Sequence, residues 1–236
     1  MFCLSRPVVS YGAMKTQGYD LIGDIHGQHG KLVGLLEAMG YQQRGSGLRA
    51  SWQHPEGRKV IFLGDYIDRG PDSCAVVDRL VAFSKQWPCT FLLGNHESMF
   101  LDFLGWTDDR YFGGDAFLMN GGDRTLASYG YFDRERPDRE SFELPKAHED
   151  FLLALVSHHR DGDYVFVHAG LGADQLRLDD ATYALRKTRP EDLLWNRTSC
   201  ETRCRTPVSA SLPSLTRCQW STAIFACGSA ARIPEA

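Results

Sequence analysis

Three short, glycine-flanked segments of the sequence carry acidic, amide and imidazole side chains directly after apolar runs. They are Gly23-Asp24-Ile25-His26-Gly27, Gly64-Asp65-Tyr66-Ile67-Asp68-Arg69-Gly70 and Gly94-Asn95-His96-Glu97. The apolar run at 59–63 predicts a buried strand, and Gly64-Asp65 follows it at once. In open α/β folds, functional sites lie at the carboxyl edge of the sheet. Carboxylates, an amide and histidines gathered at such an edge predict a metal site.

Five of these side chains make two overlapping sets of ligands. Asp24, His26 and Asp65 can hold one cation. Asp65, Asn95 and His168 can hold a second, so that Asp65 bridges the two; His168 follows a further apolar run. Oxygen and imidazole ligands without thiolate suit Mn²⁺, Fe, Zn²⁺ or Mg²⁺. Two ions about 3.5–4 Å apart produce a hydroxide at neutral pH and stabilise an in-line displacement at phosphorus.

Three further side chains of these segments suit a substrate. Arg69 has a planar guanidinium that can bind a phosphoryl group. His96 is placed for a general acid that protonates the leaving oxygen, and Asp68 can hold its other ring nitrogen and fix the tautomer. Five other histidines are expected to be ordinary core or surface residues: His29, His54, His148, His158 and His159.

The elements that must position these groups alternate between strand and helix. Apolar runs predict strands at 19–23, 59–63, 90–93 and 164–167. Helical spacing of apolar residues predicts helices at 31–39, 73–85, 97–104, 147–156 and 179–187. A loop or short hairpin is expected at 45–57, and an irregular or helical cap at 105–150. The alternation is typical of an α/β protein with a parallel or mixed sheet.

The bulk composition is that of one soluble domain. The chain has 236 residues, of which 43% are hydrophobic and 24% charged. A net charge of −4 gives no reason to expect a nucleic-acid or membrane partner. No apolar run reaches the roughly 20 residues of a membrane span, and the N-terminal apolar segment is too short for a secretory signal, so a cytoplasmic location is expected. The late cysteines fit no usual zinc spacing: Cys200, Cys204, Cys218 and Cys227.

The three segments resemble the signature of the phosphoprotein phosphatase family of metallophosphoesterases, above all its bacterial and phage serine/threonine phosphatases. Asn120-Gly121-Gly122 and Leu194-Trp195-Asn196-Arg197 are similar to segments of the same enzymes. The resemblance implies a calcineurin-like sandwich of two mixed β-sheets flanked by helices, formed by residues 15–197. It also implies a binuclear site, usually assayed with Mn²⁺, that hydrolyses a phosphoprotein or a small phosphoester.

The resemblance also implies roles for individual residues. The family's metal ligands are matched by Asp24, His26, Asp65, Asn95 and His168. Its acid pair is matched by His96 with Asp68, and its phosphate-binding arginines by Arg69 and Arg197. A bis(5'-nucleosyl)-tetraphosphate hydrolase of the same superfamily is the nearest alternative. Its usual counterpart of Asp68 is not acidic, so Asp68 favours the protein-phosphatase branch.

Residues 198–236 depart from the family's pattern. The family continues to a Gly-His-Thr motif, whose histidine is a further ligand of the second ion, and then to closing strands. No histidine follows His168 here, so we expect weaker binding of the second ion and no closing strands. A shifted reading frame or a disordered terminus is one hypothesis for this segment. The missing ligand also motivates another class of function, a catalytically impaired protein that binds phosphoryl groups through Arg69 and Arg197.

Overall fold

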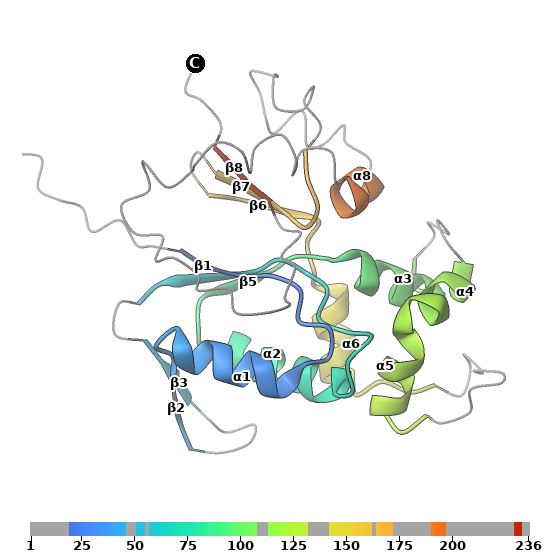
Figure 1. Cartoon of the computed structure of the whole chain (residues 1–236), viewed down its shortest axis with the longest axis horizontal. Coiled ribbons are helices and arrows are strands. Elements are labelled where there is room, and N and C mark those ends of the chain that lie inside the picture. The colour runs from blue at the N-terminus through green and yellow to red at the C-terminus, as the bar shows by residue number, and fades with distance from the viewer. Residues whose placement is uncertain are drawn as a thin grey trace, which may run out of the picture.

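Two β-sheets packed against each other form the frame of the molecule (Figure 1). The computed structural model describes residues 19–45, 51–54, 57–107, 113–131, 142–161, 164–171, 190–196 and 229–232. One sheet has the strand order β1-β4-β5 with parallel pairing, and the other has the order β6-β7-β8 with antiparallel pairing. A separate hairpin joins β2 to β3. The expected sandwich of two sheets flanked by helices is confirmed.

The strands that carry the apolar runs lie close to where the sequence predicts them. The parallel sheet consists of β1 (Tyr19–Ile22), β4 (Lys59–Phe62) and β5 (Cys89–Phe91). The antiparallel sheet consists of β6 (His158–Asp161), β7 (Tyr164–Val167) and β8 (Ser229–Arg232). The hairpin consists of β2 (Gln42–Arg44) and β3 (Ser51–Gln53); β3 lies inside the region 45–57 that was expected to hold a loop or hairpin, whereas β2 lies just before it.

Alternate side chains of β4 fill the two sides of its sheet. Val60 and Phe62 belong to the large core cluster that the helices share. Ile61 and Leu63 pack instead with Phe166 of the antiparallel sheet. A strand that is buried on both faces is apolar at consecutive positions. Because both faces of β4 are buried, its residues form a continuous apolar run, and the strand can be predicted from the sequence.

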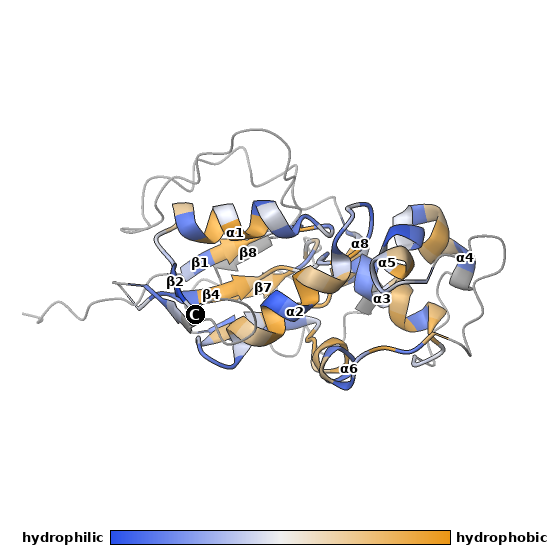
Figure 2. Cartoon of the chain, turned by 90° about the horizontal axis from the view of Figure 1, so that it is seen from below, coloured by the Kyte–Doolittle hydropathy of each residue, from blue (hydrophilic) through white to orange (hydrophobic). Residues whose placement is uncertain are grey.

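Helices cover the outer faces of the two sheets. The helices α1 (His29–Ala38) and α2 (Ser73–Ser84) lie on the side of the parallel sheet that faces away from the second sheet (Figure 1). The short helix α8 (Pro190–Trp195) packs on the antiparallel sheet, where Leu193 joins Val165 and Val167 in a core cluster. Figure 2 shows that β4 and β7 consist largely of hydrophobic residues. Among the described residues, no helix is long and apolar enough to span a membrane.

The end of the molecule beside the motif loops is helical. It contains α3 (Asn95–Phe103), α4 (Gly113–Phe117), the π-helical turn η2 (Leu118–Gly122), α5 (Asp123–Ser128) and α6 (Lys146–Leu153). The expected cap is therefore helical in its described part. Helix α6 ends earlier than predicted, because Val156 pairs with the chain after β5: the Leu93 N–H donates to the Val156 carbonyl at 2.8 Å.

Two strands were not expected from the sequence. Strand β6 is polar and has no apolar run. Strand β8 lies within 198–236, so the expectation that no closing strand follows is wrong for these four residues. It pairs with β7 from Val167 opposite Ser229 to Tyr164 opposite Arg232, and so covers one edge of the sheet. The predicted helix at 179–187, Arg197 and the four late cysteines lie outside the described residues.

Candidate active site

The carboxyl ends of β1 and β4 lie side by side and bring the first two motif loops together. The Leu63 N–H donates to the carbonyl of Ile22 at 2.8 Å, which continues the pairing of the strands. Beyond it, the carbonyl of Asp65 accepts the N–H groups of Ile25 and His26 at 2.8 and 2.9 Å. The third motif forms the first turn of α3. Backbone hydrogen bonds therefore place the first two loops against each other before any side chain is considered.

The backbone of these loops is held in an uncommon conformation. Among the described residues, the non-glycine residues with positive φ are all in the site: His26 at 46°, Asp65 at 56°, Asp68 at 71° and Arg69 at 64°. Each such residue costs about 1–3 kcal/mol and persists only where its surroundings enforce it. A side chain at Gly94 would collide with the Asp65 carboxylate, so this glycine permits the close approach of α3. The fold thus holds the strained loops in place.

Two backbone carbonyls set the tautomers of His26 and His168. The Nδ1 of His26 lies 3.0 Å from the carbonyl oxygen of Ile67, and the Nδ1 of His168 lies 2.7 Å from that of Leu63. A carbonyl oxygen only accepts, so each Nδ1 carries the proton and each Nε2 keeps its lone pair. An imidazole oriented in this way is a typical metal ligand.

The predicted bridging carboxylate lies between these two imidazoles. The Asp65 Oδ2 is 3.8 Å from the His26 Nε2, and its Oδ1 is 3.5 Å from the His168 Nε2. The Oδ2 of Asp24 lies 3.9 Å from His26 Nε2, and the Oδ1 of Asn95 lies 2.9 Å from His168 Nε2. The other oxygen of Asp24 is buried without a hydrogen-bond partner. The acceptor atoms of these carboxylate, amide and imidazole groups face one another, and a divalent cation between them would be bound by their lone pairs.

Two candidate cation groups overlap at Asp65. One contains Asp24, Asp65 and His168, and the other contains His26, Asp65 and His96. The second group includes His96, which the sequence suggested as the acid and not as a ligand. His29, His54, His148, His158 and His159 are in neither group.

Burial shifts the protonation of the outer ligands. It raises the pKa of Asp24 to about 6, with a further contribution from the charge of Asp65. It lowers the pKa of His26 to about 4, against the opposing effect of the same Asp65. Desolvation disfavours the charged form of each group. At neutral pH the His26 imidazole is therefore uncharged, the form that binds a metal.

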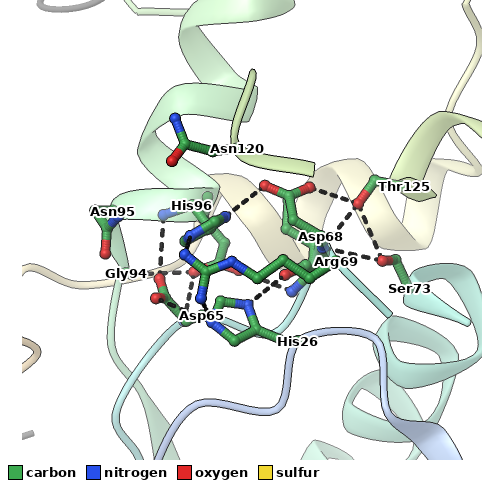
Figure 3. Close-up of polar contacts among 12 residues, drawn as sticks. His26, Asp65, Asp68, Arg69, Ser73, Gly94, Asn95, His96, Asn120 and Thr125 are labelled. Carbon is green, nitrogen blue, oxygen red and sulfur yellow. Dashed lines mark hydrogen bonds and ion pairs between the residues drawn. The ribbon is translucent and has the colours of Figure 1, made fainter. Parts of the chain in front are cut away.

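The predicted acid pair is enclosed by protein. The Nδ1 of His96 lies 2.7 Å from Asp68 Oδ2, and both side chains are fully buried. Burial raises the pKa of Asp68, while its hydrogen bond to His96 lowers it. The Arg69 guanidinium lies across the ring, with Nη2 at 2.8 Å from His96 Nε2 and Nη1 at 2.8 Å from His26 Nε2 (Figure 3). Arg69 thus links His96 of the predicted acid pair to His26, a predicted metal ligand.

Glu97 has a function that the sequence did not reveal. Its side chain is fully buried, and its two oxygens accept four backbone N–H groups. The donors belong to Gly94, Asp65, Tyr66 and Ile67, at 2.7–3.2 Å. Burial and the charge of Asp65 raise the pKa of Glu97 to about 8, against the effect of these donors. Glu97 thus holds the loop that contains Asp65 onto α3.

The helical cap also reaches the site, through residues outside the metal-binding segments. The Arg69 N–H donates to the carbonyl of Gly121 at 3.1 Å, and Gly121 has a φ of 95° in the π-helical turn. A side chain at Gly121 would lie 2.9 Å from the Arg69 nitrogen. The positive φ of Gly121 makes a kink between the helical segments on its two sides. Asn120-Gly121-Gly122, which the resemblance singled out, is therefore a support for Arg69.

The structure brings together all of the predicted site residues except Arg197, which is outside the described residues. A carboxylate shared by two candidate cation groups at the ends of parallel strands suits a hydrolase that uses two metal ions, such as a phosphoesterase. A family model described as calcineurin-like phosphoesterase matches residues 20–214. The chain belongs to this family, and the match extends beyond Arg197 into the segment expected to be atypical.

Several bacterial proteins are similar over most of the chain. A bis(5'-nucleosyl)-tetraphosphatase PrpE [asymmetrical] of Anoxybacillus flavithermus is 30% identical over 164 residues, which are 67% of this chain and 59% of that protein. The protein of the same name from Bacillus subtilis is 28% identical over 158 residues, with the same coverage of both chains. The chain thus spans about three-fifths of the length of these relatives. A metallophosphoesterase structure from Sphaerobacter thermophilus is 18% identical, with a TM-score of 0.38 over 64% of this chain and 46% of that one.

Proposed function

We propose that this chain is a metal-dependent hydrolase that acts on a dinucleoside tetraphosphate. The position of Asp65 between two imidazoles carries the hydrolase part of the proposal. The substrate is suggested by the relatives named bis(5'-nucleosyl)-tetraphosphatase, at up to 30% identity. A dinucleoside tetraphosphate, which the sequence suggested only as the alternative, thus has more support than a phosphoprotein. We keep the phosphoprotein as a second candidate substrate.

The ligands would hold two divalent cations, for which Mn²⁺ is our first choice. They are Asp24, His26, Asp65, Asn95 and His168. When bound, such cations acidify water and neutralise charge on phosphoryl oxygens. The chain contributes a bridging carboxylate, two imidazoles with fixed tautomers and an environment that excludes bulk water from Asp65 and His168, which are 4% and 2% exposed.

Arg69 and His96 would act on the substrate. Both Arg69 nitrogens that contact the histidines are donors, and a phosphoryl oxygen can accept the same N–H groups. Once Arg69 binds the phosphoryl group, the Nε2 of His96 becomes available to the leaving oxygen. The protonated His96 gives the proton on its Nε2 to that oxygen. Asp68 accepts a hydrogen bond from the His96 Nδ1–H and stabilises the imidazolium before the transfer.

A serine/threonine phosphoprotein is the second candidate substrate, favoured by the buried His96–Asp68 pair. Hydrolysis of phosphoserine releases an alkoxide, which is a strong base and needs an acid to protonate it. Hydrolysis of a phosphoanhydride releases a nucleotide phosphate, which is a weaker base and a better leaving group. The Asp68 carboxylate itself is 0% exposed and contacts His96 instead of open space. Its presence therefore argues for an acid, which the phosphoserine ester needs more than the anhydride does.

The test measures turnover of both substrates by the purified protein with Mn²⁺, together with metal analysis. We expect the larger kcat/KM for diadenosine tetraphosphate, with ATP and AMP as products. A larger value for a phosphoserine peptide would favour the second candidate. Binding of the peptide without Mn²⁺-stimulated hydrolysis of either substrate would favour the impaired, phosphoryl-binding protein.

A matched control shows whether any hydrolysis belongs to this site. The Asp65→Asn variant keeps the size of the side chain but loses the shared charge. It should lose turnover of both substrates, since the same carboxylate serves either reaction. Asp150→Asn, a change at an exposed carboxylate on α6, should leave turnover unchanged.

A further inference from the structure

Behind the His96–Asp68 pair lies a layer of hydroxyl groups that has no counterpart in the sequence analysis (Figure 3). Thr125 on α5 places its Oγ1 2.6 Å from Asp68 Oδ1 and 2.9 Å from the Asp68 nitrogen. Ser73 at the start of α2 places its Oγ 3.0 Å from Thr125 Oγ1 and 3.1 Å from the Asp68 nitrogen. Thr125 and Ser73 are both 0% exposed, like Asp68 and His96.

The direction of these hydrogen bonds follows from the proton count. An ionised carboxylate only accepts, and a hydroxyl has one proton, so Thr125 donates its proton to Asp68 Oδ1. Thr125 Oγ1 can then only accept from its other neighbours. Ser73 therefore donates to Thr125, and the Asp68 N–H donates to both hydroxyl oxygens. The hydroxyl chain runs in one direction, from Ser73 through Thr125 to Asp68.

These bonds occupy one side of the Asp68 carboxylate and leave the other side for His96. Oδ1 is held by Thr125 and Oδ2 accepts from His96 Nδ1 at 2.7 Å. A carboxylate bound at one oxygen only could rotate about its χ2 and carry the imidazole with it. With both oxygens bound, the plane of the carboxylate is fixed, and the orientation of the His96 ring with it.

The helix that carries Thr125 is itself anchored. Ser128 Oγ donates to the Thr125 carbonyl at 2.7 Å and accepts the Cys74 N–H at 3.0 Å, which ties α5 to α2. At the end of α5, the Tyr129 hydroxyl contacts His148 of α6 at 2.9 Å, and this histidine reaches Asp78 of α2 at 2.8 Å. The position of Thr125 is thus set by packing among three helices.

We propose that Thr125 is a positioning residue that orients the His96 acid through Asp68. The proposal rests on the proposed hydrolase function. Thr125 touches neither substrate nor metal, so its removal should act selectively. Substrates with a poor leaving group need the oriented acid and should suffer, whereas those with a good leaving group should not.

The first test compares phenyl phosphate, with a poor leaving group, and p-nitrophenyl phosphate, with a good one, using Mn²⁺-loaded protein. In Thr125→Val, which keeps the shape without the hydroxyl, we expect kcat for phenyl phosphate to fall about tenfold more than that for p-nitrophenyl phosphate. Thr125→Ser restores the donor and should behave like the parent. Ser128→Ala, which loosens the same helix without touching Asp68, should slow both substrates alike. Equal losses in Thr125→Val would overturn the proposal.

A double-mutant comparison separates an effect through Asp68 from a general one. In an Asp68→Asn background the acid pair is already broken, so Thr125→Val should add no further selectivity between the two esters. An added selective loss in that background would contradict the route through Asp68. If Thr125→Val does not fold, Thr125→Cys can replace it, because its S–H is only a weak donor. It should show the same selective loss of kcat for phenyl phosphate, but a smaller one.

A second readout does not depend on turnover. The His96 Nδ1–H should give a downfield proton NMR signal in the cation-free protein, assigned by its loss in His96→Asn. We expect this signal to move upfield in Thr125→Val and to stay in place in Thr125→Ser and Ser128→Ala. An unchanged signal in Thr125→Val would sink the proposal, even if the parent hydrolysed no ester and the proposed function had failed.

Discussion

The two halves of the site differ in how completely the protein satisfies its own polar atoms. In the acid half (His96, Asp68, Thr125 and Ser73), every side chain is 0% exposed and linked to the next at 2.6–3.1 Å. In the ligand half (Asp24, His26, Asp65, Asn95 and His168), the carboxylate–imidazole distances are 3.5–3.9 Å, and one buried oxygen of Asp24 has no partner. The chain completes the acid half by itself, whereas the ligand half is arranged for something from solution.

This difference follows from the cost of burying polar groups. A buried donor or acceptor without a partner costs about 1–3 kcal/mol, and a cation bound at Asp24 would remove that cost. The side chains of Asp24 and His26 are 14% and 15% exposed, which leaves a route for that partner. A cation would bind to the ligand half and leave the acid half unchanged. Variants in the two halves should therefore fail in different ways.

The largest effect is expected from Asp65→Asn, which removes the charge shared by both cation groups. Turnover of any substrate should fall at least about 100-fold, and bound Mn²⁺ should fall with it. The measurement is metal content after dialysis, together with kcat/KM for p-nitrophenyl phosphate. Near-normal turnover with full metal content would mean that the bridge is assigned to the wrong residue.

His96→Asn should show to which half of the site His96 belongs, the acid half or the ligand half. If His96 is the acid, the variant keeps its metal and loses up to about 100-fold in turnover of poor leaving groups only. The geometry also admits His96 as a cation ligand, since it shares a group with His26 and Asp65. Loss of metal in this variant would therefore place His96 in the ligand half.

Glu97→Gln should weaken the scaffold that both halves share. The amide nitrogen of glutamine would face backbone N–H donors, and two of the four hydrogen bonds would be lost. The free energy of unfolding should fall by about 1–3 kcal/mol, as measured by urea denaturation. Glu149→Gln on α6, at a partly exposed carboxylate, is the control and should change it little. If the two variants were equally stable, Glu97 would not be the residue that holds the Asp65 loop.

The ligand half could be predicted from the sequence, and the acid half only in part. Asp65 is visible because it follows a doubly buried strand and a glycine, which is a local pattern. Thr125 lies 57 residues from Asp68, on a helix whose threonine looks like any other. Only the packing of α5 on α2 brings the two together. A hydroxyl that works through tertiary contact leaves no local signal.

The same reasoning explains Glu97 and β8. Glu97 stands inside a recognised segment, but its partners are backbone N–H groups, which every non-proline residue has, so its role cannot be inferred from residue types. Ser-Ala-Ala-Arg of β8 has no strand pattern either. Its pairing satisfies the open edge of β7, a requirement that belongs to the neighbouring strand and not to the segment.

The smallest predicted effect concerns pH and the stabilisation of the ligand half by Mn²⁺. In the cation-free protein the pKa of Asp24 is about 6, above the value of about 4 in an unfolded chain. Between these values the folded state holds a proton that the unfolded state has lost, so the contribution of Asp24 to the stability of the cation-free protein declines as pH rises. Mn²⁺ needs the ionised carboxylate, so the proton competes with it below about pH 6. The pKa of His26 is lowered from 6.5 to about 4, so between these values the unfolded chain binds a proton that the folded state lacks, and the contribution of His26 to stability rises with pH and opposes that of Asp24. His26 is neutral in the folded protein above about pH 5, so it does not add to the competition between the proton and Mn²⁺.

Thermal unfolding with and without Mn²⁺, at about pH 5 and about pH 7, measures this competition. The stabilisation by Mn²⁺ should be up to about 1.4 kcal/mol larger at the higher pH, the equivalent of one pH unit below the pKa of Asp24. In Asp24→Asn the difference between the two pH values should largely disappear, because the titrating group is gone. A difference that survives in this variant would show that another group controls cation binding, and that the unpartnered oxygen of Asp24 does not await a cation.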